Sequence, residues 1–266
     1  MPELPEVETV ASGMRTSILG RCILRIETFR ADLRRPIPDM KCFEGCTIRE
    51  IGRRAKYLAL KFDGSANRLY IHLGMSGRIT ISQPKPRLKH DHVVFHLDDG
   101  QEVVFNDARR FGQIIINREP ELFGHLGPEP LSEEFDATYL AEKLKGRKGS
   151  IKTSIMNQEL VVGVGNIYAS EALWRCGISP KRAAGKVSRK RLEELVISIR
   201  QVLEEAIASG GSTLRDYVRS SGDLGYFQHQ FAVYGRDGQA CKRCATPIQK
   251  IVQLNRSTYF CPDCQH

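Results

Sequence analysis

The chain lacks the marks of a membrane or secreted protein. None of its 266 residues falls in an apolar stretch approaching the roughly 18 uninterrupted residues of a membrane span. The amino terminus, MPELPEVET, is acidic where a secretory signal peptide is basic. There is also no internal repeat and no low-complexity tract, which excludes a repeat protein. We therefore expect a soluble globular protein in the cytoplasm.

Acidic residues are fewer than basic ones. The chain has 31 Asp and Glu against 40 Lys and Arg, which gives a net charge of +9 and a pI near 9.2. Such a surplus favours a polyanionic partner. The basic residues are grouped at positions 53–56, 143–152 and 181–191. Each group fits a solvated face as well as a binding surface, so charge alone does not name the partner.

The pattern of apolar residues predicts a β-rich first half and a helical second half. The spacing of Val7, Val10 and Met14 predicts a helix over 4–18. Eight alternating or apolar runs then predict strands, at 22–28, 47–51, 57–62, 69–73, 78–81, 92–97, 102–105 and 113–116. Eight strands imply a sandwich or a flattened barrel. Residues 124–135 contain two prolines and no periodicity, which indicates a domain boundary, and a long helix is expected over 188–209.

The cysteines indicate a metal site. Four of the eight fall within residues 241–264, as Cys241-x2-Cys244 and Cys261-x2-Cys264. Two thiolate pairs at this spacing provide the four tetrahedral ligands that zinc prefers. With no open ligand position, one structural Zn²⁺ holding a hairpin is expected. The others lack such spacing, and we expect ordinary buried thiols at Cys22, Cys42, Cys46 and Cys176.

Two further segments suit phosphate binding. Arg256 lies near the expected tip of the metal-bound hairpin, where a guanidinium could grip phosphate, although a solvated arginine fits equally well. In residues 160–174, Gly163 and Gly165 predict a tight turn, and Asn166 is expected to cap a new helix. Amides at a helix start suit phosphate, but the same glycines could simply let two helices pack closely.

The amino terminus is unusual for a basic protein, because Glu3, Glu6 and Glu8 crowd beside Pro2. The helix dipole explains Glu6 and Glu8 but says nothing of Pro2. Removal of the initiator methionine would turn Pro2 into a free secondary amine. An α-amino group with a pKa of about 7.8 is roughly 15% neutral at pH 7, against under about 0.1% for an ordinary lysine. Pro2 is therefore a candidate nucleophile.

Several motifs together resemble the bacterial formamidopyrimidine-DNA glycosylase family. They are PELPEVET at 2–9, RRAKY at 53–57, HLGMSG at 72–77, KHDH at 89–92, DARRFG at 107–112, GVGNIYASE at 163–171 and the zinc ribbon. The resemblance spans the whole chain. It implies an α+β multi-domain fold: an eight-stranded β-sandwich with an amino-terminal helix (1–131), a helical helix-two-turns-helix domain with a lesion loop (132–230), and a zinc-finger hairpin (231–266).

The resemblance also implies a function. Members flip oxidised purines, chiefly 8-oxoguanine and formamidopyrimidines, out of double-stranded DNA and excise them, in base excision repair. By similarity Pro2 attacks the sugar, forms a Schiff base, and cleaves the strand by β,δ-elimination. Such an enzyme is expected to be a monomer that associates with the nucleoid when it binds DNA.

Individual roles follow from the same resemblance. Glu3 resembles the general acid, which needs a carboxyl with a pKa raised by burial, and Glu6 resembles a supporting carboxylate. Lys56 resembles a lysine that contacts phosphate and assists elimination. Arg256 resembles the ribbon arginine that holds phosphates and donates a proton in δ-elimination.

Other residues resemble DNA contacts of the family. The side chains that fill the gap left by the flipped nucleotide correspond to Met75, Arg109 and Phe111, two of which would otherwise be read as core. Further DNA contacts correspond to His90, Arg109, Arg147, Lys152 and Asn166, with Arg147 standing where many relatives have lysine. Residues 220–230 lie where the family closes a mobile loop over the base.

Two alternatives remain open. One is an endonuclease VIII-like glycosylase for oxidised pyrimidines, against which Leu4 and DARRFG argue. The other is a non-catalytic zinc-ribbon protein that binds nucleic acid. Charge, ribbon and helix turn all fit the second alternative, so only Pro2, Glu3 and Lys56 separate it from the enzyme.

Overall fold

A computed structural model describes residues 1–117, 122–212 and 227–266. Their contacts form two compact units, one of residues 1–124 with 207–228 and one of residues 125–206 with 229–266. The division into three domains at 131 and 230 stays a prediction. Within the described ranges, no helix is both long and apolar enough to cross a membrane.

The first unit contains one helix and two four-stranded sheets. The helix is α1 (Leu4–Ile18), and a short 3-10 turn, η1 (Lys41–Phe43), precedes the second strand. The strands are β1 (Ile23–Thr28), β2 (Ile48–Arg54), β3 (Tyr57–Phe62), β4 (Arg68–His72), β5 (Gly77–Ser82), β6 (Asp91–Leu97), β7 (Glu102–Asp107) and β8 (Gln113–Asn117). They pair antiparallel in the orders β1-β6-β7-β5 and β2-β3-β4-β8. The predicted eight-stranded sandwich is confirmed.

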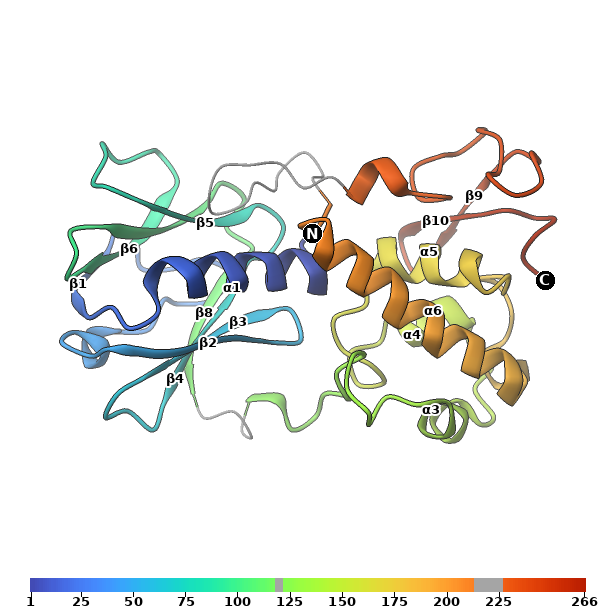
Figure 1. Ribbon diagram of the computed structural model, residues 1–266, viewed down its shortest axis with the longest axis horizontal. Helices are drawn as coiled ribbons and strands as arrows, with labels where there is room; N and C mark the ends of the chain where they lie inside the picture. Colours follow the sequence, from blue (N-terminus) through green and yellow to red (C-terminus); the bar gives the residue numbers. More distant parts are fainter. Residues whose placement is uncertain (118–121, 213–226) are drawn as a thin grey trace. The chain divides into compact units, whose positions relative to one another are not determined.

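Helix α1 belongs to the core of this sandwich. Figure 1 shows it running between the two sheets. Val7, Val10 and Met14, the residues that predicted the helix, are each at most 1% exposed and share one apolar cluster with side chains of both sheets. Burying a side chain of this kind contributes about 1.5–3 kcal/mol. The packing therefore holds the amino terminus of α1 in a defined place.

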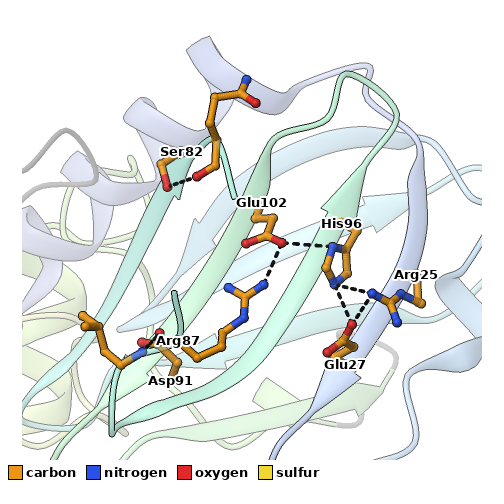
Figure 2. Close-up of polar contacts among 9 residues, drawn as sticks. Arg25, Glu27, Ser82, Arg87, Asp91, His96 and Glu102 are labelled. Carbon is orange, nitrogen blue, oxygen red and sulfur yellow. Dashed lines mark hydrogen bonds and ion pairs between the residues drawn. The ribbon is translucent and has the colours of Figure 1, made fainter. Parts of the chain in front are cut away.

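A charged network joins strands of the first sheet. Figure 2 shows His96 of β6 between Glu27 of β1 and Glu102 of β7. The ring nitrogens of His96 lie 3.1 Å from the Glu27 carboxylate and 3.2 Å from the Glu102 carboxylate. Arg25 also pairs with Glu27. The side chain of Glu102 is only 5% exposed, and Arg87 donates to it at 2.6 Å. The Glu102 carboxylate raises the pKa of Arg87, so the buried charge is compensated.

The second unit is helical and ends in a hairpin. Its elements are α3 (Ala137–Leu144), α4 (Ile151–Ile155), α5 (Asn166–Arg175), η2 (Ala184–Lys186), α6 (Arg189–Ala208), η3 (Phe227–Gln230), β9 (Gln249–Gln253) and β10 (Arg256–Phe260), with the ends of α6 and η3 shared with the first unit. Leu192, Leu195 and Ile199 are buried along α6. Gly210 follows with φ 74°, as a helix-terminating glycine requires.

Two turns connect α4 to α5. Gln158 holds them with its side chain, which accepts from the amide of Gly163 at 2.9 Å and donates to the carbonyls of Met156 and Val164. Gly163 has φ 79°, which the turn requires and a side chain would disfavour. The expected helix-two-turns-helix arrangement is confirmed.

Candidate active site and phosphate-binding surface

Helix geometry fixes the first residues of the chain. Pro2 is buried, and Glu3, the N-cap of α1, is 3% exposed. The amide of Glu3 donates to Oε2 of Glu6 at 2.9 Å, while the Glu3 carboxylate accepts from the amide of Glu6, a reciprocal capping box. The burial that the general-acid role of Glu3 needs is therefore present.

The second oxygen of Glu6 binds a distant part of the chain. Its Oε1 accepts from both the amide and the hydroxyl of Ser212, at 2.8 Å each. Gly211 allows this approach, because a Cβ there would lie 3.3 Å from Oε1 of Glu6 and its φ is 79°. Glu6 is 2% exposed. Both of its oxygens serve in holding backbone, which is the geometry of a positioning residue.

Lys56 lies in the turn between β2 and β3 and is 7% exposed. Arg53 fixes this turn: its Nη1 donates to the carbonyl of Ala55 at 2.9 Å, and its Nε lies 3.2 Å from Oε2 of Glu8 on α1. Arg15 also pairs with Glu8, at 2.6 Å. A chain of charge-assisted contacts therefore links α1 to the turn that carries Lys56.

His72, at the end of β4, is a site residue that the motifs contained but did not single out. Its Nδ1 accepts from the amide of Gly74 at 3.0 Å, which places the ring proton on Nε2. Burial, and then the charges of Lys56 and Arg34, lower the pKa of His72 from 6.5 to about 4. The ring is therefore a neutral imidazole whose charge environment includes Lys56.

Asp107 organises the two loops that carry the expected gap-filling residues. It is fully buried; Oδ1 accepts from the hydroxyl of Ser76 at 2.6 Å and the amide of Arg109 at 3.2 Å, and Oδ2 accepts from the amide of Gly112 at 2.7 Å. Its own amide donates to the carbonyl of His90 at 3.0 Å. The carboxylate of Asp107 thus joins the loops beside Met75 and Phe111, and its backbone amide adds the segment of His90.

Backbone packs directly on backbone between these loops. A Cβ on Gly74 would lie 2.4 Å from the carbonyl carbon of Phe111, so only glycine fits. Phe111 is 44% exposed, and the guanidinium of Arg109 lies 5.2 Å from the centre of its ring. The core interpretation of Phe111 is therefore wrong. Met75 is partly buried on the neighbouring loop.

In the second unit, a buried lysine links three elements. Lys152 of α4 is 1% exposed and donates to Oδ1 of Asn166 at 2.5 Å and to the hydroxyl of Thr258 at 2.7 Å. The amide nitrogen of the Asn166 side chain donates to the carbonyl of Ser257 at 2.8 Å. The expectation that Asn166 caps α5 is wrong: Gly165 is the N-cap, and the Asn166 side chain is engaged by these tertiary partners.

Lys152 opens onto a basic hollow of about 690 Å³. Arg147 and Arg256 line the same hollow, with Asn157, Gln253 and other residues of α4 and the hairpin. Arg256 is the first residue of β10, directly after the two-residue turn, as expected for the tip of the hairpin. The structure therefore brings together three cations that the sequence associated with DNA.

The four ribbon cysteines fit a tetrahedral zinc ion. Their sulfur atoms lie within 4.8 Å of one another, with Cys241 and Cys264 3.9 Å apart and Cys244 and Cys261 3.4 Å apart. A tetrahedron with Zn–S distances of about 2.3 Å requires about 3.8 Å. Burial raises the pKa of Cys241, but amide donors from Arg243 and Cys244 outweigh it and lower the pKa to about 6. These residues would hold one structural zinc, which supplies the hairpin with cross-links.

The remaining cysteines differ from expectation. Cys42 is exposed, and Cys22, Cys46 and Cys176 are only partly buried, so describing all four as buried thiols is wrong. Burial does raise the pKa of Cys176, to about 11.

Comparison with known proteins gives matches to three domain families along the chain. Residues 1–114 match the formamidopyrimidine-DNA glycosylase N-terminal domain, residues 126–218 its H2TH domain, and residues 238–266 the zinc finger found in FPG and IleRS. The chain belongs to the formamidopyrimidine-DNA glycosylase family. Among relatives, the formamidopyrimidine-DNA glycosylases of Ruegeria sp. (strain TM1040) and Thioalkalivibrio sulfidiphilus are 46% and 48% identical, with 100% of both chains covered.

Solved structures of the family superpose over the full length. A variant of Lactococcus lactis FPG in complex with DNA containing Fapy-dG has a TM-score of 0.92 at 36% identity, with 100% of each chain covered. The MutM (FPG) protein of Thermus thermophilus has a TM-score of 0.89 at 38% identity, covering 99% of this chain and 98% of that one.

One further acidic residue of this family member escaped the sequence analysis. Glu171 of α5 is 2% exposed, and its carboxylate accepts from the amides of Ala232, Val233 and Tyr234 at 2.8–3.0 Å. The ring of Tyr234 then packs on Tyr259 of β10, 5.1 Å between centres. In the sequence, the motif GVGNIYASE places this acidic residue on an apolar helical face, a pattern that predicts a buried carboxylate with hydrogen-bond partners. The expected lid, residues 220–230, lies mostly outside the described residues.

Proposed function

We propose that the protein is a bifunctional DNA glycosylase and abasic-site lyase of base excision repair, which excises oxidised purines from duplex DNA. The observation that carries the proposal is the buried Pro2–Glu3 pair, held by a capping box at the start of α1. The chain carrying this pair is similar from end to end to proteins solved with Fapy-dG or abasic-site DNA.

Pro2 serves as the nucleophile once Met1 has been removed, and Met1 is 41% exposed. The secondary amine attacks C1′ of the damaged nucleotide, the base departs, and the sugar opens to a cationic iminium. The positive charge acidifies the C2′ proton, whose loss expels the 3′ phosphate. A second elimination expels the 5′ phosphate, which leaves a one-nucleotide gap.

Glu3 supplies the proton for the opening sugar or the departing base. Lys56 supplies positive charge beside the reacting phosphate, and Arg53 holds its turn in place. Glu6 is given a supporting role, since its oxygens hold the amide of Glu3 and the Ser212 segment. Neutral His72 adds a donor, its Nε2–H, without a further charge.

DNA binding is divided between two groups of residues. Arg147, Lys152 and Arg256 bind the phosphate backbone in the basic hollow, and Asn166, whose Oδ1 accepts from Lys152, is a further DNA contact. Arg256 also donates a proton in δ-elimination. Met75, Arg109 and Phe111 replace the flipped nucleotide in the duplex, with His90 as a further contact. We propose a monomer that acts on the nucleoid in the cytoplasm.

Borohydride trapping tests the chemistry directly. Zinc-loaded protein lacking Met1, mixed with duplex DNA carrying 8-oxoguanine opposite cytosine and with borohydride, is expected to form a covalent adduct that maps to Pro2. An adduct on Lys56 instead, or none with protein that cuts this DNA, would refute the nucleophile.

Two variants test the other catalytic roles. E3Q is expected to lose base excision but to keep some cutting of a preformed abasic site, and unchanged excision would remove Glu3 from the acid role. K56M is expected to slow strand cleavage, while K61M, at an exposed lysine of β3, is the matched control. Faster excision of oxidised pyrimidines than of 8-oxoguanine would favour the endonuclease VIII-like activity, and binding without excision would favour a non-catalytic protein.

A further inference from the structure

Leu254 occupies a backbone position that suits leucine poorly. It is the first of two residues between β9 and β10, and its φ is 45°. Two-residue hairpin turns with left-handed residues favour glycine, asparagine or aspartate, because a larger side chain crowds the backbone. The second position, with φ 58°, holds such a residue, Asn255. The first does not.

The Leu254 side chain gains little from the protein around it. It is 77% exposed, more than any other large apolar side chain in the described ranges. A single exposed leucine needs no explanation. An exposed leucine in an unfavourable backbone conformation is different, since replacing it by asparagine or glycine would relieve the backbone and sacrifice no core packing.

The surroundings of Leu254 indicate what the side chain contacts. It lines the same hollow as Lys152 and Arg256, where Met156 is the other large apolar side chain. A phosphate bound among these cations is flanked along the DNA strand by deoxyribose rings, whose C–H faces are apolar. The hollow thus combines charge for the phosphate with an apolar wall at the turn.

We propose that Leu254 packs against the deoxyribose next to a phosphate bound in this hollow and strengthens duplex binding by a non-ionic contact. This inference rests on the proposed function, because it requires that the hollow binds DNA. The proposal also distinguishes the effect of Leu254 on binding from that of the neighbouring cations. Cations that bind phosphate release counterions, so they set the slope of log affinity against log salt, whereas an apolar contact leaves that slope unchanged.

The test compares turn variants of the zinc-loaded, full-length protein. Binding to a fluorescent duplex with a tetrahydrofuran abasic analogue is measured by anisotropy across a salt series. L254N and L254G suit the left-handed turn but lack the apolar side chain. N255G relieves the neighbouring turn residue in the same way and keeps Leu254, which makes it the matched control.

We expect L254N and L254G to bind about 3- to 10-fold more weakly at every salt concentration, with an unchanged slope. N255G should bind like the unaltered protein, all three should melt at the same temperature or higher, and R256Q should reduce the slope by about one. Full affinity in L254N, a changed slope, or an equal loss in N255G would overturn the inference. Absence of salt-dependent duplex binding by the unaltered protein would instead overturn the proposed function, and with it this contact.

Discussion

Acid should destabilise the first unit through His72. Burial of this ring, and then the charges of Lys56 and Arg34, lower its pKa from 6.5 to about 4, and its Nδ1 accepts from the amide of Gly74. The unfolded chain binds a proton near pH 6.5, and the folded chain does not until about pH 4. The contribution of His72 is therefore fully present above pH 6.5, is lost progressively as pH falls from 6.5 to 4, and changes no further below that.

The size of the effect follows from the two pKa values. A difference of one pKa unit corresponds to about 1.4 kcal/mol, so the fall from 6.5 to about 4 corresponds to about 3 kcal/mol. That is a large part of the stability of an ordinary domain. Other groups also titrate in this range, so the comparison must be with a variant that lacks only the imidazole. H72N is suitable, since its Oδ1 can accept from the amide of Gly74 in place of Nδ1.

The assay is urea unfolding at intervals between pH 7.5 and pH 4, followed by far-ultraviolet circular dichroism. Fluorescence of the single tryptophan, Trp174, reports separately on the second unit. The unaltered protein should lose about 3 kcal/mol more than H72N across this interval. H125N, at an exposed histidine of the second unit, should follow the unaltered protein. Parallel curves for the unaltered protein and H72N would show that His72 is not held neutral by the fold.

Three other changes test how the sites are held. G74A should destabilise the first unit by about 2–4 kcal/mol in the same urea assay, and weaken binding of lesion DNA, because its Cβ would lie 2.4 Å from the backbone of Phe111. The control G45A, at a glycine with φ 77° and open space around it, should lose only about 1 kcal/mol of stability. E171Q should lower the stability of the second unit by about 1–3 kcal/mol in Trp174 fluorescence, since one of its side-chain acceptors becomes a donor facing amide N–H groups; an unchanged midpoint would contradict this. Zinc removal by a chelator should reduce DNA affinity in anisotropy while the circular dichroism transition of the first unit stays in place, and normal affinity without zinc would contradict the role of the hairpin.

Local pattern predicted much of the fold. The face of α1 follows from a spacing within one helix, the strands from runs of five to seven residues, and the zinc site from two Cys-x2-Cys pairs. In each case the residues that carry the signal also make the structure. The location of Arg256 at the hairpin tip follows in the same way, because the cysteines set the length of the hairpin.

Local pattern did not predict which groups the side chains bind. Asn166 is of a residue type common at helix N-caps, yet its side chain hydrogen-bonds to Lys152 and to Ser257, which lies 91 positions away. Nothing local distinguishes the two uses of one amide. Phe111 likewise is a residue type typical of a core, yet its side chain is 44% exposed while the backbone of its loop packs on Gly74.

The sequence by itself determined the eight strands, the apolar face of α1, the metal ligands and, through its motifs, the family. Tertiary structure alone decided which groups face one another: Ser212 on Glu6 across 206 positions, Thr258 on Lys152 across 106, and His72 kept neutral beside Lys56. The physical reason is the range of the forces involved. Periodicity and metal-ligand spacing involve residues that are close in sequence, whereas burial, charge environment and hydrogen-bond partners depend on segments that meet only after the chain has folded.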